Sequence, residues 1–186
     1  MIGYALCGSF CTLRRSLDAL AVLLESGYEV RPILSEAVAS TDTRFFLASE
    51  LRREVEEMTG REAITRIVDA EPLGPREPLD ALILAPCTGN TLAKLSLGIT
   101  DSTVTMAAKA HLRSDRPLLI SLASNDSLSQ NLTSIARLTT RKETFFVPMR
   151  QDDPIGKPYS LVADFRLIPE CLSAALAGKQ LRPLFL

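Results

Sequence analysis

The chain has 186 residues, 46% of them hydrophobic and 23% charged, with a formal net charge of −1. This length is sufficient for one domain with a full hydrophobic core. The near-neutral charge argues against nucleic acid or an anionic membrane surface as a partner, and no apolar run approaches the roughly 20 residues that span a bilayer. The first six residues contain no basic segment and are typical of a strand, not a signal peptide, so we expect a cytoplasmic protein.

The cysteine and histidine content argues against a metal centre. Cys7, Cys11, Cys87 and Cys171 include no pair with metal-ligand spacing, and the single histidine, His111, has no neighbouring cluster of ligands. In a cytoplasmic chain of this size, cysteines are expected to be reduced thiols. We therefore predict no bound metal and no disulfide framework.

The first half of the chain alternates short apolar runs with longer segments of helical period. Gly27 and Gly60 follow two of the helical segments, where glycine commonly ends a helix. The predicted elements are a strand at residues 2–7, a helix at 13–24, a strand at 28–34, a helix at 47–58 and a short strand at 64–68.

The same alternation continues in the second half, after a connection containing Pro72, Pro75 and Pro78 that cannot be helix interior. Residues 79–85 are apolar apart from Asp80, as in strands that are covered on both faces of a parallel sheet. The predicted elements are a strand at 79–85, helices at 91–97 and 103–113, a strand at 118–123, a helix at 128–138, a strand at 144–147 and a helix from Pro169 to 177. This order predicts a single α/β domain over residues 1–186, a three-layer doubly wound parallel sheet of flavodoxin-like or Rossmann-like type.

Ligands of open parallel sheets bind beyond the carboxyl ends of the strands, so the loops that leave the strands are the candidate site. The first is Gly8-Ser9-Phe10-Cys11-Thr12, where N–H groups and hydroxyls can surround an anion and Gly8 permits close approach. The alternative is that Gly8 makes a tight turn and Ser9 caps the following helix. The chain contains no GxGxxG, so this loop is not a dinucleotide fingerprint.

Two further loops carry small polar residues. Pro86-Cys87-Thr88-Gly89-Asn90-Thr91 follows the most apolar strand; we expect Pro86 to end that strand, and the hydroxyl and amide groups either bind a ligand or only cap the next helix. Ser124-Asn125-Asp126 follows the strand at 118–123 and is equally typical of a turn. Cys87 is either a low-pKa thiol at a helix start or a plain buried cysteine.

Other side chains extend the candidate site. Ser35, Thr43 and Phe45 follow the second strand and can close another wall, although adjacent aromatics more often pack in a core. Cationic candidates for a ligand carboxylate are Arg44, Lys94, Lys109 and His111. On residues alone, an exposed or capping role is favoured over catalysis for His111.

Residues 85–94, Ala-Pro-Cys-Thr-Gly-Asn-Thr-Leu-Ala-Lys, followed by Gly98-Ile99-Thr100-Asp101, resemble the signature of the flavoprotein family of homo-oligomeric flavin-containing cysteine decarboxylases, which includes flavin prenyltransferases. In that family the loops after the first and fourth strands hold FMN. The resemblance implies that FMN is the cofactor and that the chain forms a homo-oligomer. The implied cofactor-binding residues are Gly8, Ser9, Phe10, Cys11, Ser35, Thr43, Phe45, Pro86, Cys87, Thr88, Gly89, Asn90, Thr91, Ser124 and Asn125.

Nearly the whole chain resembles one branch of this family, the B subunits of dipicolinate synthases. The matching segments are residues 8–11, 41–45, 67–72, 86–94, 106–113 and 151–154. This resemblance implies oxidation of a dihydro- or hydroxytetrahydro-dipicolinate precursor from the lysine pathway to dipicolinic acid during sporulation. It also implies a partner, the A subunit, that brings NADPH, and a small dicarboxylate substrate.

The chain departs from the decarboxylases at two functional positions. No histidine precedes His111, whereas those enzymes use a catalytic histidine early in the chain, and their proline–alanine–methionine–asparagine motif corresponds to residues 122–125, where only Asn125 remains. We therefore leave the catalytic residue unassigned. Three hypotheses remain: a catalytic or co-catalytic subunit, a non-catalytic partner that stabilises the A subunit with a vestigial pocket, and an independent FMN-dependent decarboxylase or prenyltransferase.

Overall fold

Seven strands form one mixed sheet in the computed structural model, which describes residues 1–74 and 76–186. The parallel strands that lie side by side are, in spatial order, β2 (Val30–Leu34), β1 (Ile2–Leu6), β3 (Ala81–Cys87) and β4 (Leu118–Ser124). β5 (Thr144–Phe146) pairs in parallel with the first half of β4. At the other end of β4, β7 (Leu161–Ala163) pairs antiparallel, and β6 (Met149–Arg150) pairs antiparallel with β7.

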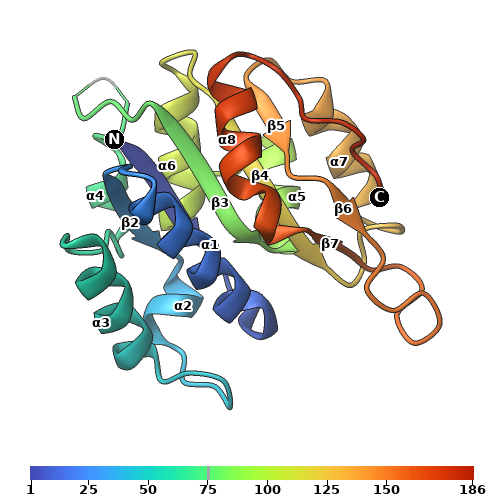
Figure 1. Ribbon diagram of the computed structural model, residues 1–186, viewed down its shortest axis with the longest axis horizontal. Helices are drawn as coiled ribbons and strands as arrows, with labels where there is room; N and C mark the ends of the chain where they lie inside the picture. Colours follow the sequence, from blue (N-terminus) through green and yellow to red (C-terminus); the bar gives the residue numbers. More distant parts are fainter. Residues whose placement is uncertain (75) are drawn as a thin grey trace.

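Helices cover both faces of this sheet, giving three layers (Figure 1). One face carries α1 (Leu13–Glu25), α2 (Glu36–Ser40), α3 (Ala48–Thr59) and α8 (Ile168–Leu176). The opposite face carries α4 (Ile67–Ala70), α5 (Gly89–Leu97), α6 (Thr103–Leu112) and α7 (Leu132–Thr139). Short 3-10 turns, η1 (Phe10–Thr12) and η2 (Phe165–Leu167), precede α1 and α8. None of the described helices has the length and hydropathy needed to cross a bilayer.

The strands are apolar because both of their faces are covered. Along β1, Tyr4 and Leu6 pack in the core beneath α1 and α8, whereas Ala5 and the following Cys7 pack in the core beneath α5 and α6. All seven residues of β3 are buried. The predicted three-layer α/β fold of flavodoxin-like type is confirmed, with a mixed sheet in place of a wholly parallel one.

Two strands and two short helices, α2 and α4, were absent from the prediction. β6 and β7 contain two and three residues, too few for an alternating or apolar run to stand out. α2 contains five residues. The strand predicted at residues 64–68 is wrong, since only Ile64 bridges Ile33 and the chain then enters α4. There the Thr65 carbonyl accepts a hydrogen bond from Thr103 Oγ1 at 3.1 Å, away from the sheet.

Several element boundaries also differ from the prediction, and two of the differences have a clear cause. Pro86 does not end its strand: β3 continues to Cys87 with a register shift after Leu84, because the Pro86 carbonyl still accepts from Cys7 N at 3.1 Å. The helix predicted at 128–138 begins later, at Leu132, because the preceding residues turn around the Asp126 carbonyl. Of the three prolines in the connection before β3, Pro75 lies outside the described residues.

His111 lies in the last turn of α6 and is fully buried, so the exposed position, one of the two roles favoured for it, is wrong. Its Nε2 lies 2.9 Å from the carbonyl oxygen of Pro117, and its Nδ1 has no hydrogen-bond partner among the described residues. Burial lowers the pKa of the imidazole below its ordinary value. The ring is therefore neutral in the folded protein and donates from Nε2 to Pro117.

The buried neutral imidazole predicts loss of stability in mild acid. Below about pH 6.5 the unfolded chain binds a proton at His111 that the folded chain excludes, so the free energy of unfolding falls as the pH is lowered, by at most about 1.4 kcal/mol per pH unit for one group. Urea unfolding at pH 7.5 and pH 5.5 measures this difference. Because the chain has one histidine, His111→Gln should reduce the difference; an equal difference in both proteins would contradict the assignment.

Candidate functional site

The loops after β1 and β2 meet at the carboxyl edge of the sheet. Ser35 N donates to the Leu6 carbonyl at 3.0 Å, which holds the first residue after β2 against the end of β1. A Cβ atom placed on Gly8 would lie 3.4 Å from the Cβ of Ala37, so the loop after β1 packs against α2. The candidate residues Gly8 and Ser35 are thus brought to the same part of the edge.

The loops after β1 and β3 are joined by two hydrogen bonds. Cys7 N donates to the Pro86 carbonyl at 3.1 Å. The Thr91 hydroxyl donates to Cys7 Sγ at 3.5 Å, and the Thr88 hydroxyl donates to Thr91 Oγ1 at 3.1 Å. These contacts bring together two of the three candidate loops predicted from the sequence.

The loops after β3 and β4 are in direct contact at Gly89. A Cβ atom on Gly89 would lie 2.5 Å from Ser124 Oγ, 2.7 Å from Asn131 Nδ2 and 2.8 Å from Asp126 Oδ1. The Asp126 carboxylate accepts hydrogen bonds from Ser124 Oγ and, at 2.9 Å, from Asn131 Nδ2. Four strand ends therefore form one continuous edge, which we call the cradle: Gly8–Thr12, Ser35, Thr88–Thr91 and Ser124–Asp126. The sequence did not indicate Asn131, because it lies within a segment of helical period.

The geometry of the first loop separates the two interpretations offered for Gly8 and Ser9. The φ angle of Gly8 is outside the left-handed region, so its backbone does not require glycine. Ser9 Oγ accepts from Thr12 Oγ1 at 3.0 Å and makes no cap hydrogen bond to a backbone N–H. The tight turn at Gly8 is confirmed, since Ser9 N donates to the Cys7 carbonyl at 2.8 Å, whereas capping by the Ser9 side chain is wrong.

Capping does account for two other hydroxyls. Thr88 Oγ1 accepts from Thr91 N at 3.2 Å at the start of α5, and Ser35 Oγ accepts from Val38 N at 3.4 Å at the start of α2. The hydrogen of the Thr88 hydroxyl is also used, since it points to Thr91. Within the described residues, the Ser9 and Ser35 hydroxyls accept hydrogen bonds without donating one, so both can donate to a ligand.

The two buried thiols of the cradle are not activated nucleophiles. Burial raises the pKa of the Cys7 thiol to about 11 and raises the pKa of Cys87 well above its ordinary value. Both thiols are therefore protonated at neutral pH, and the low-pKa alternative for Cys87 is wrong. Cys11, in contrast, is exposed.

The loop between α2 and α3 carries three candidates and extends away from the sheet, at the bottom of the view in Figure 1. Phe45 is 45% exposed, so it does not pack in the core. The Arg44 guanidinium lies 4.8 Å from the centroid of the Phe45 ring. The Thr43 hydroxyl accepts from the backbone N–H groups of Phe45 and Phe46, both at 3.2 Å. These interactions of the three side chains all lie within their own loop, which they stabilise.

The remaining cationic candidates lie outside the cradle. Lys94 Nζ is 2.9 Å from both carboxylate oxygens of Asp101, in the second half of α5. Lys109 is exposed on α6, close in sequence to His111. His111 contacts Pro117, which directly precedes β4, so the last turn of α6 lies at the amino edge of the sheet. His111 and Lys109 are therefore at the opposite end of the strands from the cradle.

Comparisons with known proteins agree with this architecture. A profile of the Flavoprotein family matches residues 1–164. Over 183 residues, covering 98% of this chain and 92% of the relative, the sequence is 45% identical to the B subunit of dipicolinate synthase from Bacillus subtilis (strain 168).

Two solved structures are similar to this chain in fold. The crystal structure of the dipicolinate synthase B subunit from Bacillus halodurans C has a TM-score of 0.91 at 39% identity, covering 100% of this chain and 95% of that one. The FMN-dependent cysteine decarboxylase SpaF has a TM-score of 0.67 at 22% identity, covering 95% of this chain and 94% of its own, which shows a shared fold. The chain belongs to the Flavoprotein family, and within that family to the dipicolinate synthase B subunits.

Proposed function

We propose that this chain is the flavin-binding subunit of a dipicolinate synthase. In this proposal it holds FMN at the cradle and acts with an A subunit to oxidise a dihydro- or hydroxytetrahydro-dipicolinate precursor to dipicolinic acid. The observation that carries the proposal is the contact between the loops after β2, β1, β3 and β4, which form one edge of small and polar residues. The 45% identity to a dipicolinate synthase B subunit supports the choice of reaction.

The residues of the cradle fit the phosphate-bearing part of a flavin. Gly8 is partly exposed in the first loop, and the Ser9 and Ser35 hydroxyls have hydrogens to donate to phosphate oxygens. Asn90 and Asn125 are exposed at the same edge and can donate and accept hydrogen bonds. When bound, a flavin supplies an acceptor for the two hydrogens that aromatisation removes.

The partners follow from the same proposal. The A subunit supplies the nicotinamide site, since this chain has no dinucleotide fingerprint. NADP+ bound there would accept the hydride from the reduced flavin and become NADPH. The substrate is a small dicarboxylate, the complex works in the cytoplasm of the sporulating cell, and the chain assembles as a homo-oligomer. The competing candidate is a non-catalytic partner with a vestigial pocket, which is favoured by the Thr88 hydroxyl, whose hydrogen-bonding capacity is used within the protein.

FMN uptake tests the role of Gly8. Gly8→Ala should change the free energy of unfolding by less than about 1 kcal/mol, because the backbone φ accepts alanine and the new methyl group has ordinary contacts. The methyl group would hold a phosphate away from the loop, so the affinity for FMN, measured by titration and flavin absorbance, should fall at least ~10-fold.

Gly98→Ala is the matched control. Gly98 has a φ of +74° at the far end of α5, so alanine there should lower stability by about 1–2 kcal/mol and leave FMN affinity unchanged. A wild-type protein that shows no flavin spectrum on purification and no uptake of added FMN would end the flavin proposal.

Reconstitution with the A subunit tests whether this chain takes part in the reaction. Dipicolinate formation should require both chains, and Asn90→Ala should lower the rate of the complex at least ~10-fold if its amide contacts a reactant. Asn90 is exposed and caps no helix in the structure, so the variant should fold normally. Full turnover by the A subunit alone would support the non-catalytic alternative instead.

A further inference from the structure

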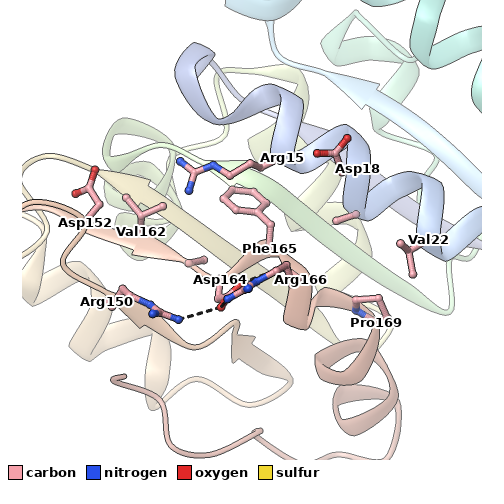
Figure 2. A pocket seen from close by; sticks show the side chains of 12 residues that line it. Arg15, Asp18, Val22, Arg150, Asp152, Val162, Asp164, Phe165, Arg166 and Pro169 are labelled. Atoms are coloured by element: carbon pink, nitrogen blue, oxygen red, sulfur yellow. Dashed lines mark hydrogen bonds and ion pairs between the residues drawn. The ribbon is translucent and has the colours of Figure 1, made fainter.

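A cavity of about 580 Å³ opens on the face of the sheet that carries α1 and α8, outside the cradle (Figure 2). Ala19 and Val22 of α1 form one wall, and Val162 and Ala163 of β7 form the other. The Phe165 ring lies between them, with only 3% of that residue exposed. The cavity is within the size range of small-molecule sites and, like them, is lined mainly by apolar groups.

Three arginines border this cavity, and they differ in whether they form an ion pair with a carboxylate. Arg150 and Arg166 share the Asp164 carboxylate, at 3.0 Å and 2.6 Å. The hydrogen bonds from Arg166 and the charge of Arg150 hold the pKa of that carboxyl below its ordinary value. Asp164 is therefore an anion that two guanidinium groups already neutralise.

Arg15 is the exception. Its guanidinium carbon lies 5.9 Å from the centroid of the Phe165 ring, and no ion pair of Arg15 is found among the described residues. Figure 2 shows its side chain extending over the ring, whereas Asp18 lies further along α1.

Asp152, another acidic side chain at the cavity, also has partners within the protein. It accepts from Ser160 Oγ at 2.5 Å and lies 3.3 Å from Lys157 Nζ. Asp18 also lines the cavity and makes no ion pair among the described residues. The three arginines and Lys157 carry four positive charges against the three carboxylates of Asp18, Asp152 and Asp164, so one positive charge remains beside a buried aromatic ring and apolar walls.

We propose that this cavity binds a planar aromatic carboxylate, with Arg15 binding the carboxylate and Phe165 packing against the ring of the ligand. A guanidinium group matches a carboxylate with two parallel N–H donors, and a flat ring fits an aromatic side chain between apolar walls. Arg15 stands in the first turn of α1, directly after the loop Gly8–Thr12, so the ligand would lie beside the cradle. Identification of this ligand with the aromatic product of a dipicolinate synthase rests on the proposed function.

Calorimetric titration of the full FMN-free chain tests the site without any catalytic readout. The probes are pyridine-2,6-dicarboxylate, benzene-1,3-dicarboxylate and glutarate, in buffer free of divalent cations because the pyridine compound chelates them. Both aromatic probes should give saturable binding. Glutarate has two carboxylates and no ring, so it should bind at least ~10-fold more weakly. Equal binding of glutarate, or no saturable binding of either aromatic probe, would overturn the proposal.

Two neighbouring arginines provide a matched pair of variants. Arg15→Met keeps an apolar stem over Phe165 and removes the charge, so affinity for the aromatic probes should fall at least ~10-fold. Arg14→Met removes an exposed arginine that pairs with Glu54 at 2.6 Å outside the cavity, so affinity should be unchanged. Equal loss in both variants, or none in Arg15→Met, would refute the site. FMN titration of the same proteins is a separate measurement, so failure of the cradle and failure of this cavity can be distinguished.

Discussion

The hydrogen bond from Cys7 N to the Pro86 carbonyl is the contact on which the candidate site depends. It joins β1 and β3 just beyond Leu6, the last residue of β1, where regular pairing gives way to a register shift in β3. Proline has no N–H to donate, but its carbonyl accepts normally, and that is sufficient to keep the two loops together. The Thr91–Cys7 contact lies next to this bond and reinforces it. The parallel direction of the four central strands then brings every polar loop to one side.

Much of this architecture could be predicted because its main strands are buried on both faces. An uninterrupted apolar run such as β3 is a strong signal, and parallel strands connected by helices follow from it. β6 and β7 could not be predicted in the same way. Their pairing depends on β4 extending to Ser124, where Leu161 lies opposite, and two or three residues of sequence carry no periodicity of their own.

The candidate site was predictable at the level of loops and not at the level of individual charges. Loops that follow buried strands must meet at one edge, so Gly8, Thr88 and Ser124 are brought together by topology. His111 was misjudged because its helical face was considered without the direction of its helix. A helix that leads into the next parallel strand ends at the amino edge, so a residue six positions before Pro117 lies far from the strand ends that bind ligands. Arg15 and Phe165 are 150 positions apart in the sequence, and only the folded chain brings them together.

Gly89 limits how the protein can respond to an occupant. Its Cα faces the Ser124, Asp126 and Asn131 side chains with no room for a methyl group, and Asn131 is the residue from which α7 begins. In such close packing, the first turn of α5 cannot approach β4 without displacing the first turn of α7. The positions of the two helices are therefore coupled: a ligand that displaced the first turn of α5 toward β4 would also displace the first turn of α7.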